Sequence, residues 1–217
     1  MKEKEVNRMK RILLSGVLIL LCAQMAFAQE KIEAPAWNVG DKWVFTQGMK
    51  MEVLKADEND YVVEFPNQTL VFGKSTLNKG FTVQGKKREP YRGNQRRLLD
   101  FPLTIGKTWK DTYSEALKWE DTYTGRVGGS SLGDETQIFE SYKVLGWEEV
   151  ELRAGKFKAV KIEYRKGWSS PGTGMVEGKA WYWYSPEIKY AIKYQYDKST
   201  MWTKLSNWEL ISFELMK

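Results

Sequence analysis

Apolar and polar residues alternate along most of the chain after residue 28. No 12-residue stretch there keeps apolar residues at the helical spacing i, i+3, i+4 and i+7 between helix caps, whereas β-branched and aromatic residues recur throughout. This pattern predicts a mainly β protein. Its strands are expected at residues 42–46, 49–55, 61–65, 69–72, 81–84, 108–121, 138–145, 148–152, 157–164, 179–184, 189–196 and 208–215.

Most of these strands are joined by short polar or glycine-containing breaks, such as residues 57–60, 154–155 and 185–187. Parallel strands need crossovers of a dozen residues or more, so breaks this short predict antiparallel pairing. Twelve antiparallel strands in one sheet curl rather than stay flat. We therefore expect residues 29–217 to form one domain with a single curved antiparallel sheet, an incomplete barrel, and we keep a β-sandwich as the alternative.

The first 28 residues have the three parts of a secretory signal peptide. A basic start precedes an apolar stretch at residues 12–21, and small residues follow, ending in Ala26-Phe27-Ala28. Cleavage after Ala28 would release a periplasmic or extracellular protein without a transmembrane span. Two alternatives are an uncleaved anchor, although Ser15 and Gly16 interrupt the apolar run, and lipid attachment at Cys22, although Leu21 before it is not small.

The positive charge of the chain is concentrated in two places. The formal net charge is +6, and half of it lies in the predicted signal peptide, with five basic and two acidic residues. A basic cluster in the remaining chain carries a net +5 when Glu89 is counted, against +3 for residues 29–217 as a whole. It could contact an anionic surface, such as lipid headgroups, or remain a solvated loop. Since this charge is local and the protein is expected to be exported, nucleic acid is not a predicted partner. The cluster consists of Lys86, Lys87, Arg88, Arg92, Arg96 and Arg97.

The chain contains no histidine, and its one cysteine, Cys22, lies in the predicted signal peptide. These counts exclude histidine-dependent triads, imidazole zinc sites and, after cleavage, thiol catalysis and disulfides. A GxSxG pattern surrounds Ser131, but the nucleophile elbow needs a histidine base and a strand–turn–helix context. We therefore expect no enzyme activity, no cofactor and no metal site.

Aromatic residues are the most informative candidates for binding. In a strand at 179–184, Trp181 and Trp183 share one face, and Tyr182 and Tyr184 share the other. In the following strand, Tyr190 and Ile192 share a face with Tyr194 and Tyr196. These rings either pack in the core or form a wall facing a ligand. The predicted wall residues are Trp181, Trp183, Tyr190 and Ile192.

Four stretches occur in an order that resembles a known class of protein. They are 37–43 (WNVGDKW), 101–109 (FPL, then GKTW), 154–163 (AGKFKA, then KIE) and 183–194 (WYSPE, then AIKY). Together they resemble exported β-rich bacterial proteins of unknown function with a half-barrel similar to the lipoprotein-localisation (LolA/LolB-like) domains. The resemblance implies a curved sheet with a concave apolar face, and it suggests lipid or lipoprotein handling by analogy of fold alone.

Two functions remain open from the sequence. The first is an exported, non-enzymatic envelope protein that binds an apolar or amphipathic ligand, such as a lipid or a lipoprotein acyl chain, on its curved sheet. The second is a structural or interaction module of the envelope that binds a protein or a glycan and holds no small ligand. An apolar cavity of several hundred cubic ångströms would favour the first function, and a filled core would favour the second.

Overall fold

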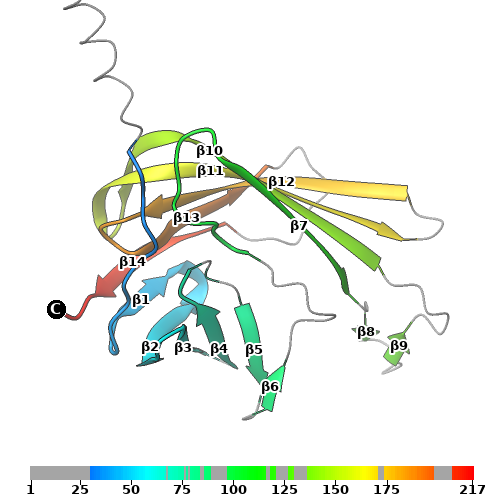
Figure 1. Cartoon of the computed structure of the whole chain (residues 1–217), viewed down its shortest axis with the longest axis horizontal. Coiled ribbons are helices and arrows are strands. Elements are labelled where there is room, and N and C mark those ends of the chain that lie inside the picture. The colour runs from blue at the N-terminus through cyan, green and yellow to red at the C-terminus, as the bar shows by residue number, and fades with distance from the viewer. Residues whose placement is uncertain are drawn as a thin grey trace, which may run out of the picture. The chain divides into compact units, whose positions relative to one another are not determined.

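The computed structural model describes residues 30–66, 68–75, 77, 79–83, 86–88, 97–115, 118–120, 127–129, 136–170, 174–197 and 207–217 (Figure 1). Residues 32–217 form one compact unit. The predicted signal peptide and its cleavage site lie outside the described residues.

Twelve strands of the compact unit join in one antiparallel sheet, in the order β6-β5-β4-β3-β2-β1-β14-β13-β12-β11-β10-β7. The sheet is curved and open, with β6 and β7 at its edges, so the predicted fold class is confirmed. The sandwich alternative is wrong, because a single hydrogen-bonded sheet contains all twelve strands; β8 and β9 form a separate small pair.

The short-strand half of the sheet comes mainly from the first part of the chain. Its strands are short because polar turns recur every few residues, and one of these turns is closed by a hydrogen bond from the Asp57 N–H to the Asp60 carbonyl. The elements are β1 (Lys42–Phe45), the 3-10 turn η1 (Thr46–Gly48), β2 (Lys50–Ala56), β3 (Asp60–Phe65), β4 (Gln68–Gly73), β5 (Lys79–Val83) and β6 (Lys86–Arg88).

The long-strand half contains β7 (Thr108–Glu115), β10 (Thr136–Leu152), β11 (Gly155–Ser170), β12 (Gly174–Ser185) and β13 (Tyr190–Tyr196). Strands expected separately at 138–145 and 148–152 form one 17-residue strand, because a register shift between Val144 and Gly146 absorbs the irregularity without ending the strand. The strand expected at 108–121 is divided instead into β7 and β8 (Lys118–Glu120), and β8 pairs with β9 (Val127–Gly129).

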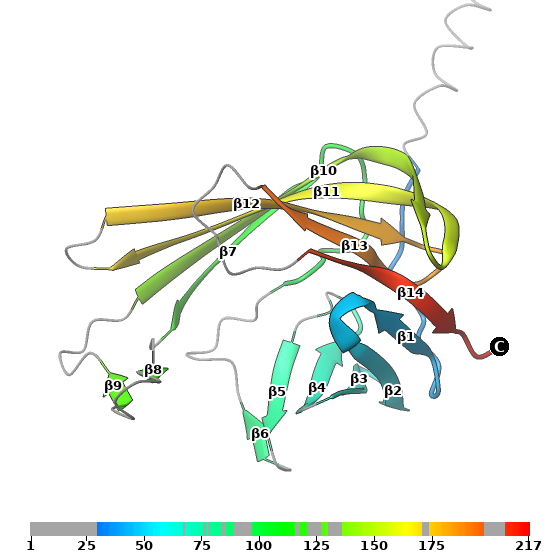
Figure 2. The same ribbon diagram turned by 180° about the vertical axis from the view of Figure 1, so that it is seen from behind.

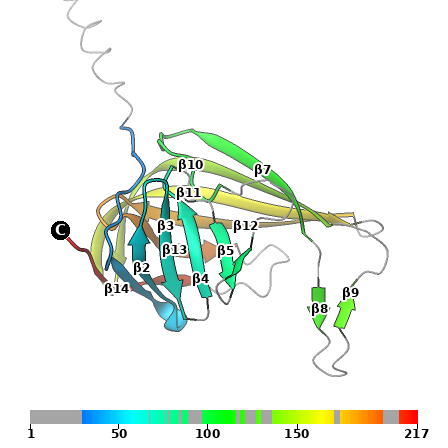
Figure 3. The same ribbon diagram turned by 60° about the horizontal axis from the view of Figure 1, so that its bottom comes forward.

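Strand β14 (Trp208–Glu214) connects the two halves. It pairs with β1 along its length but with β13 only at Lys193↔Glu209 and Tyr194↔Trp208. Figure 2 shows the consequence from behind: the short strands run nearly crosswise to the long ones. The same crossing is visible from below in Figure 3, where β2 to β5 lie over the long strands.

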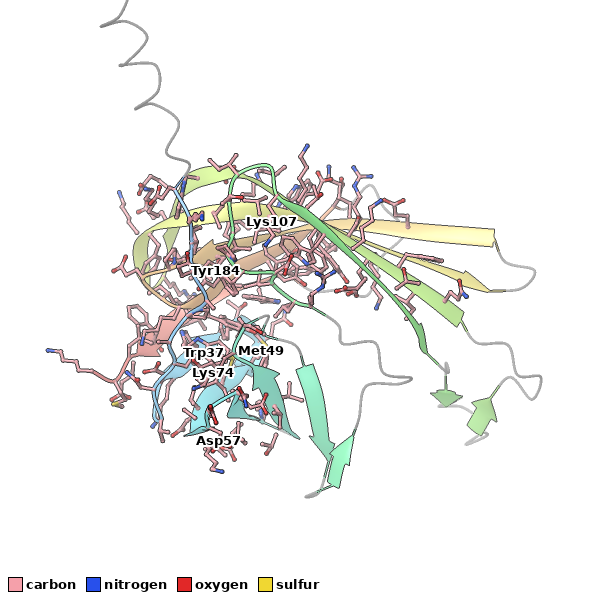
Figure 4. The ribbon with its side chains drawn as sticks, in the orientation of Figure 1. Trp37, Met49, Asp57, Lys74, Lys107 and Tyr184 are labelled. Carbon is pink, nitrogen blue, oxygen red and sulfur yellow. The ribbon has the colours of Figure 1, made fainter. Side chains whose placement is uncertain are left out.

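The core lies between the crossed halves (Figure 4). Its members alternate along the strands; in β1 and β2, for example, Trp43, Phe45, Met51 and Val53 are all buried. Figure 4 places Trp37 beside the short strands and Tyr184 with the long strands. Both side chains belong to one continuous apolar cluster, so the two halves share a core.

Candidate functional site

One aromatic side chain from each of six neighbouring strands forms a row across the inner face of the sheet. Neighbouring ring centroids are 4.8–5.9 Å apart, and the row starts with Trp109 stacked on Tyr142 at an interplanar angle of 7°. Such spacing is typical of favourable aromatic pairs. The row consists of Trp109 (β7), Tyr142 (β10), Tyr164 (β11), Tyr182 (β12), Tyr194 (β13) and Trp208 (β14).

The strand register explains the row. Tyr142 stands opposite both Trp109 and Tyr164, and Tyr194 stands opposite both Tyr182 and Trp208. Cross-strand partners share a face, so rings at these positions must project together. The alternation within each strand was visible in the sequence, whereas the register that aligns the rings between strands was not.

A buried carboxylate accepts hydrogen bonds from two phenols of this row. Glu140 is fully buried, and its carboxylate oxygens lie 2.7 Å from the Tyr164 hydroxyl and 3.1 Å from the Tyr142 hydroxyl. Hydrogen bonding compensates for the loss of hydration of such a group. Glu140 therefore holds the two rings in place.

The row continues into a second aromatic cluster where the halves cross. Trp208 contacts Phe45 at 5.0 Å between centroids, and Tyr190 lies within 6.0 Å of Phe45, Trp43 and Trp37. Burial raises the pKa of the Tyr190 and Tyr184 phenols, and it raises the pKa of Tyr194 to about 12. Chemistry that needs a phenolate at neutral pH is therefore disfavoured at these rings.

Two indole N–H groups of the cluster bond to backbone carbonyls of the turn between β12 and β13. Trp43 Nε1 donates to the Ile188 carbonyl at 2.9 Å, and Trp37 Nε1 donates to the Lys189 carbonyl at 2.8 Å. These bonds connect the short-strand half to the long-strand half beyond the point where β13 and β14 stop pairing. The indole donors are used in packing and are not presented to a ligand.

The predicted ligand wall does not form one surface. Trp183 pairs with Lys161 and Lys193 on the outer face, and Trp181 lies on that face as well. Tyr190 belongs to the inner cluster, and Ile192 is in the core. Trp183, Tyr190 and Ile192 are 5%, 7% and 0% exposed. The structure therefore does not bring the four predicted residues together.

Charged side chains surround the two tryptophans on the outer face. Trp183 Nε1 donates to Glu148 at 2.7 Å, and the Lys161 ammonium lies 3.0 Å from the same carboxylate. The ammonium groups of Lys161 and Lys193 each lie 4.9 Å from the Trp183 ring centroid, a cation–π distance. Burial opposes ionisation of Glu148, but the bonds from Trp183 and Lys161 outweigh it and lower its pKa.

A second ionic group lies beside Trp181. Glu163 accepts hydrogen bonds from Lys179 and Arg165, both at 2.8 Å, and Arg165 also reaches Glu177 at 3.1 Å. The bond from Lys179 is the main cause of the lowered pKa of Glu163. The charges on this part of the outer face therefore neutralise one another and stabilise the strands on which they lie.

The structure describes only part of the predicted basic cluster. Lys86, Lys87 and Arg88 form the edge strand β6, and Arg92 and Arg96 lie outside the described residues. Arg97 forms ion pairs with Asp111 at 3.0 Å and Asp100 at 3.6 Å. Its contact with an anionic surface stays a prediction, and binding there would compete with these two carboxylates.

A groove of about 440 Å³ crosses β1, β2 and β3. Its lining consists of residues 42–44, 50–52 and 64–66 together with Gly48. Alternation places the middle residues of the three triplets, Trp43, Met51 and Phe65, on the opposite face, so their backbone forms the floor. No local sequence pattern indicates this groove, since lysine and glutamate on short strands are typical of an ordinary solvated face.

The described part of the chain shows no grouping of metal ligands and no helix suited to a membrane. No three Asp, Glu, His or Cys side chains there are grouped closely enough to hold a metal ion. No helix within the same residues is long and apolar enough to cross a membrane. Glu148 and Glu149 point to opposite faces of β10, as expected for neighbours in a strand, and Ser131 lies outside the described residues.

Comparison with known proteins gives weak likenesses. No family model matches the chain, and no curated protein does. A predicted lipoprotein from Parabacteroides distasonis is 13% identical with a TM-score of 0.43, covering 85% of this chain and 100% of that one.

Two further solved structures are similar to the same degree. A predicted exported protein with a YmcC-like fold from Bacteroides fragilis is 13% identical, with a TM-score of 0.40. The match covers 84% of this chain and 99% of that chain. The hypothetical lipoprotein YmcC of Escherichia coli is 11% identical, with a TM-score of 0.42, over 86% and 90% of the two chains. None of the three carries a LolA or LolB name, so that resemblance stays a prediction.

Proposed function

We propose that this protein is an exported, non-enzymatic module of the cell envelope that binds a partner protein or glycan through its surface. Export is supported by the signal-like residues 1–28. The absence of histidine from the whole chain, together with a single cysteine inside the signal-like segment, supports a role other than catalysis.

The observation that carries this proposal is the closed packing of the inner aromatic cluster. A carrier of acyl chains needs an apolar cavity that can accept them. Here Trp37, Trp43 and Tyr190 pack against one another, and both indole N–H groups are bonded to backbone carbonyls. A core packed in this way favours a rigid scaffold over a container.

Native mass spectrometry combined with organic extraction tests this proposal. The mature protein would be purified gently from a bacterial periplasm and then exposed to added fatty acid or phospholipid. The expected result is the bare protein mass before and after exposure, with no lipid in the extract. A stoichiometric lipid released on denaturation, or uptake of one added lipid per chain, would overturn the interaction-module proposal in favour of the lipid-binding one.

A Tyr190→Ala variant provides a matched control for the same experiment. Removal of this ring leaves space among Trp37, Trp43 and Phe45. If the wild-type core is closed, Tyr190→Ala should take up added lipid and the wild type should not. Equal uptake by both proteins would show that the ligand binds outside the aromatic cluster.

A further inference from the structure

The groove across β1, β2 and β3 carries two charges that the rest of the described chain does not neutralise. The register places Lys42, Glu52 and Glu64 in one row across the three strands, and Lys42 pairs with Glu52 at 3.4 Å. Glu64 stands directly opposite Glu52 and has no ion pair within the described residues. Like charges at opposite positions destabilise a sheet, so this arrangement calls for a positive group.

The opposite charge lies one row away in the same groove. Lys50 stands opposite Val44, and it makes no ion pair with any residue that the structure describes. Pro66, at the end of β3, contributes the remaining side chain of that row. The groove therefore presents a positive group, a negative region and apolar side chains together, within a volume in the range of small-ligand sites, roughly 300–1,000 Å³.

We propose that this groove binds a short peptide segment of a partner protein, with a basic side chain placed against Glu52 and Glu64 and an acidic side chain placed against Lys50. The proposal rests on the proposed function and names the class of partner. Val44 and Pro66 contact the apolar residue between the two charges. The segment is held by charge complementarity on both sides of this apolar contact.

Other ligand classes match the groove less well. A nucleic acid or an acidic glycan carries negative charge alone and would meet Glu52 and Glu64. A neutral glycan needs an exposed ring on which to stack, but Phe65 packs on Phe72 at 6.3 Å instead. An acyl chain would offer no charged partner to Glu64 or Lys50. A peptide can supply both signs of charge and an apolar residue in one short segment.

The probe for this proposal is the capped tripeptide acetyl-Lys-Val-Asp-amide. It would be titrated into the isotope-labelled mature protein, with backbone amide shifts recorded by NMR. We expect saturable shifts confined to residues 42–52 and 64–66, with a dissociation constant below about 1 mM, a weak but specific affinity. No saturable shift up to that concentration would overturn the proposal.

Substitutions in the groove test the role of each charge. Lys50 and Glu64 are exposed, so Lys50→Gln and Glu64→Gln leave the fold intact, and each should weaken binding roughly three- to fivefold, the range of an exposed ion pair. Matched controls are Lys156→Gln and Glu151→Gln, which change an exposed ion pair in the β10–β11 hairpin and should leave the affinity unchanged. Equal weakening by the controls would contradict the groove assignment.

Two further binding measurements distinguish recognition of a peptide from simple attraction between charges. The peptides acetyl-Lys-Val-Lys-amide and acetyl-Asp-Val-Asp-amide carry one sign of charge each, and binding of either as tightly as the mixed peptide would overturn the proposal.

Vesicles containing phosphatidylethanolamine present an ammonium and a phosphate in one headgroup. Sedimentation with these vesicles that Lys50→Gln abolishes would assign the groove to a lipid headgroup instead.

Lipid uptake and peptide binding together distinguish failure of the groove proposal from failure of the proposed function. A protein that takes up no lipid and also ignores the mixed peptide remains an interaction module, with its partner bound elsewhere. A protein that releases a stoichiometric lipid loses the interaction-module proposal, whatever the peptide does.

Discussion

The two halves of the sheet are stabilised in different ways. In the long-strand half, β10 and β11 pair from the hairpin at residues 152–155 to Gln137↔Ser169 with one register shift, and Glu148 and Glu163 link strands on the outer face. In the short-strand half, no strand exceeds seven residues. The long half has the longer ladder, whereas the short half has a ladder of short strands and is also anchored to the turn between β12 and β13.

Three side chains make these contacts. Trp37 and Trp43 donate to carbonyls of the turn, and the buried Asp41 accepts from Lys189 within it at 3.4 Å. Asp41 also accepts from the backbone N–H of Asn38 at 2.9 Å and of Met216 at 2.7 Å. Local stability in proteins follows such differences, so the halves should open independently when these anchors are removed.

The largest expected effect is that of Trp43→Ala. It empties a fully buried aromatic site and removes the bond to the Ile188 carbonyl, so the free energy of unfolding should fall by about 3–5 kcal/mol. Amide hydrogen exchange should accelerate in β1 to β4 before it does so in β10 and β11. Denaturant unfolding and exchange followed by mass spectrometry measure the two effects.

Trp43→Phe is the control for this substitution. Phenylalanine keeps most of the apolar volume but lacks the N–H, so the cost should be nearer to that of one hydrogen bond, about 1–2 kcal/mol. If Trp43→Ala accelerated exchange equally in both halves, the two would form one cooperative unit, and the contrast between them would be lost.

Asp41→Ala should have the next largest effect. It removes the buried acceptor of three hydrogen bonds from part-buried donors, which costs about 1–3 kcal/mol. The amide of Met216 should lose its protection from exchange, because its acceptor is gone. Continued protection at Met216 would mean that β14 holds the C-terminal residues without Asp41.

The sequence placed strands throughout the long-strand half but missed the continuity of β10 and the break between β7 and β8, and it gave no sign of the connection between the halves. Alternation over β11 to β13 located each strand and the faces of Trp181 to Tyr184, since these depend on neighbouring residues alone. The pairing of Trp43 with the turn at Ile188 spans 145 residues, and no local pattern encodes it. The four predicted wall residues lie on different faces because strand parity fixes faces only within a strand, while the register between strands decides which residues meet.

An alkaline titration tests the junction of the halves at Tyr194. Burial raises the pKa of this phenol to about 12, above its ordinary value of 10, so the folded state favours the neutral form. The free energy of unfolding therefore keeps its full value well below pH 10 and falls as the pH rises toward 12. The loss from Tyr194 is about 1 kcal/mol at pH 11.

Tyr194→Phe should remove this contribution to the alkaline loss of stability. The variant would be compared with the wild type by denaturant unfolding at pH 8 and pH 11. An identical loss in both proteins would assign the alkaline sensitivity to other tyrosines, such as Tyr184 and Tyr190, whose pKa values are also raised by burial.

The smallest effect is expected on the outer face of the long-strand half, at Glu163→Gln. The bonds from Lys179 and Arg165 lower the pKa of Glu163 below its ordinary value of 4.5, so they stabilise the fold above that pH, and the stabilisation is lost as the pH falls through the folded-state pKa. The substitution should therefore cost less than about 1 kcal/mol at pH 7, and less in acid than at pH 7, as measured by urea unfolding. The backbone ladder of β11 and β12 remains intact without the carboxylate. A cost at pH 7 equal to that of Asp41→Ala would mean that side-chain ion pairs, and not the ladder, hold the long-strand half together.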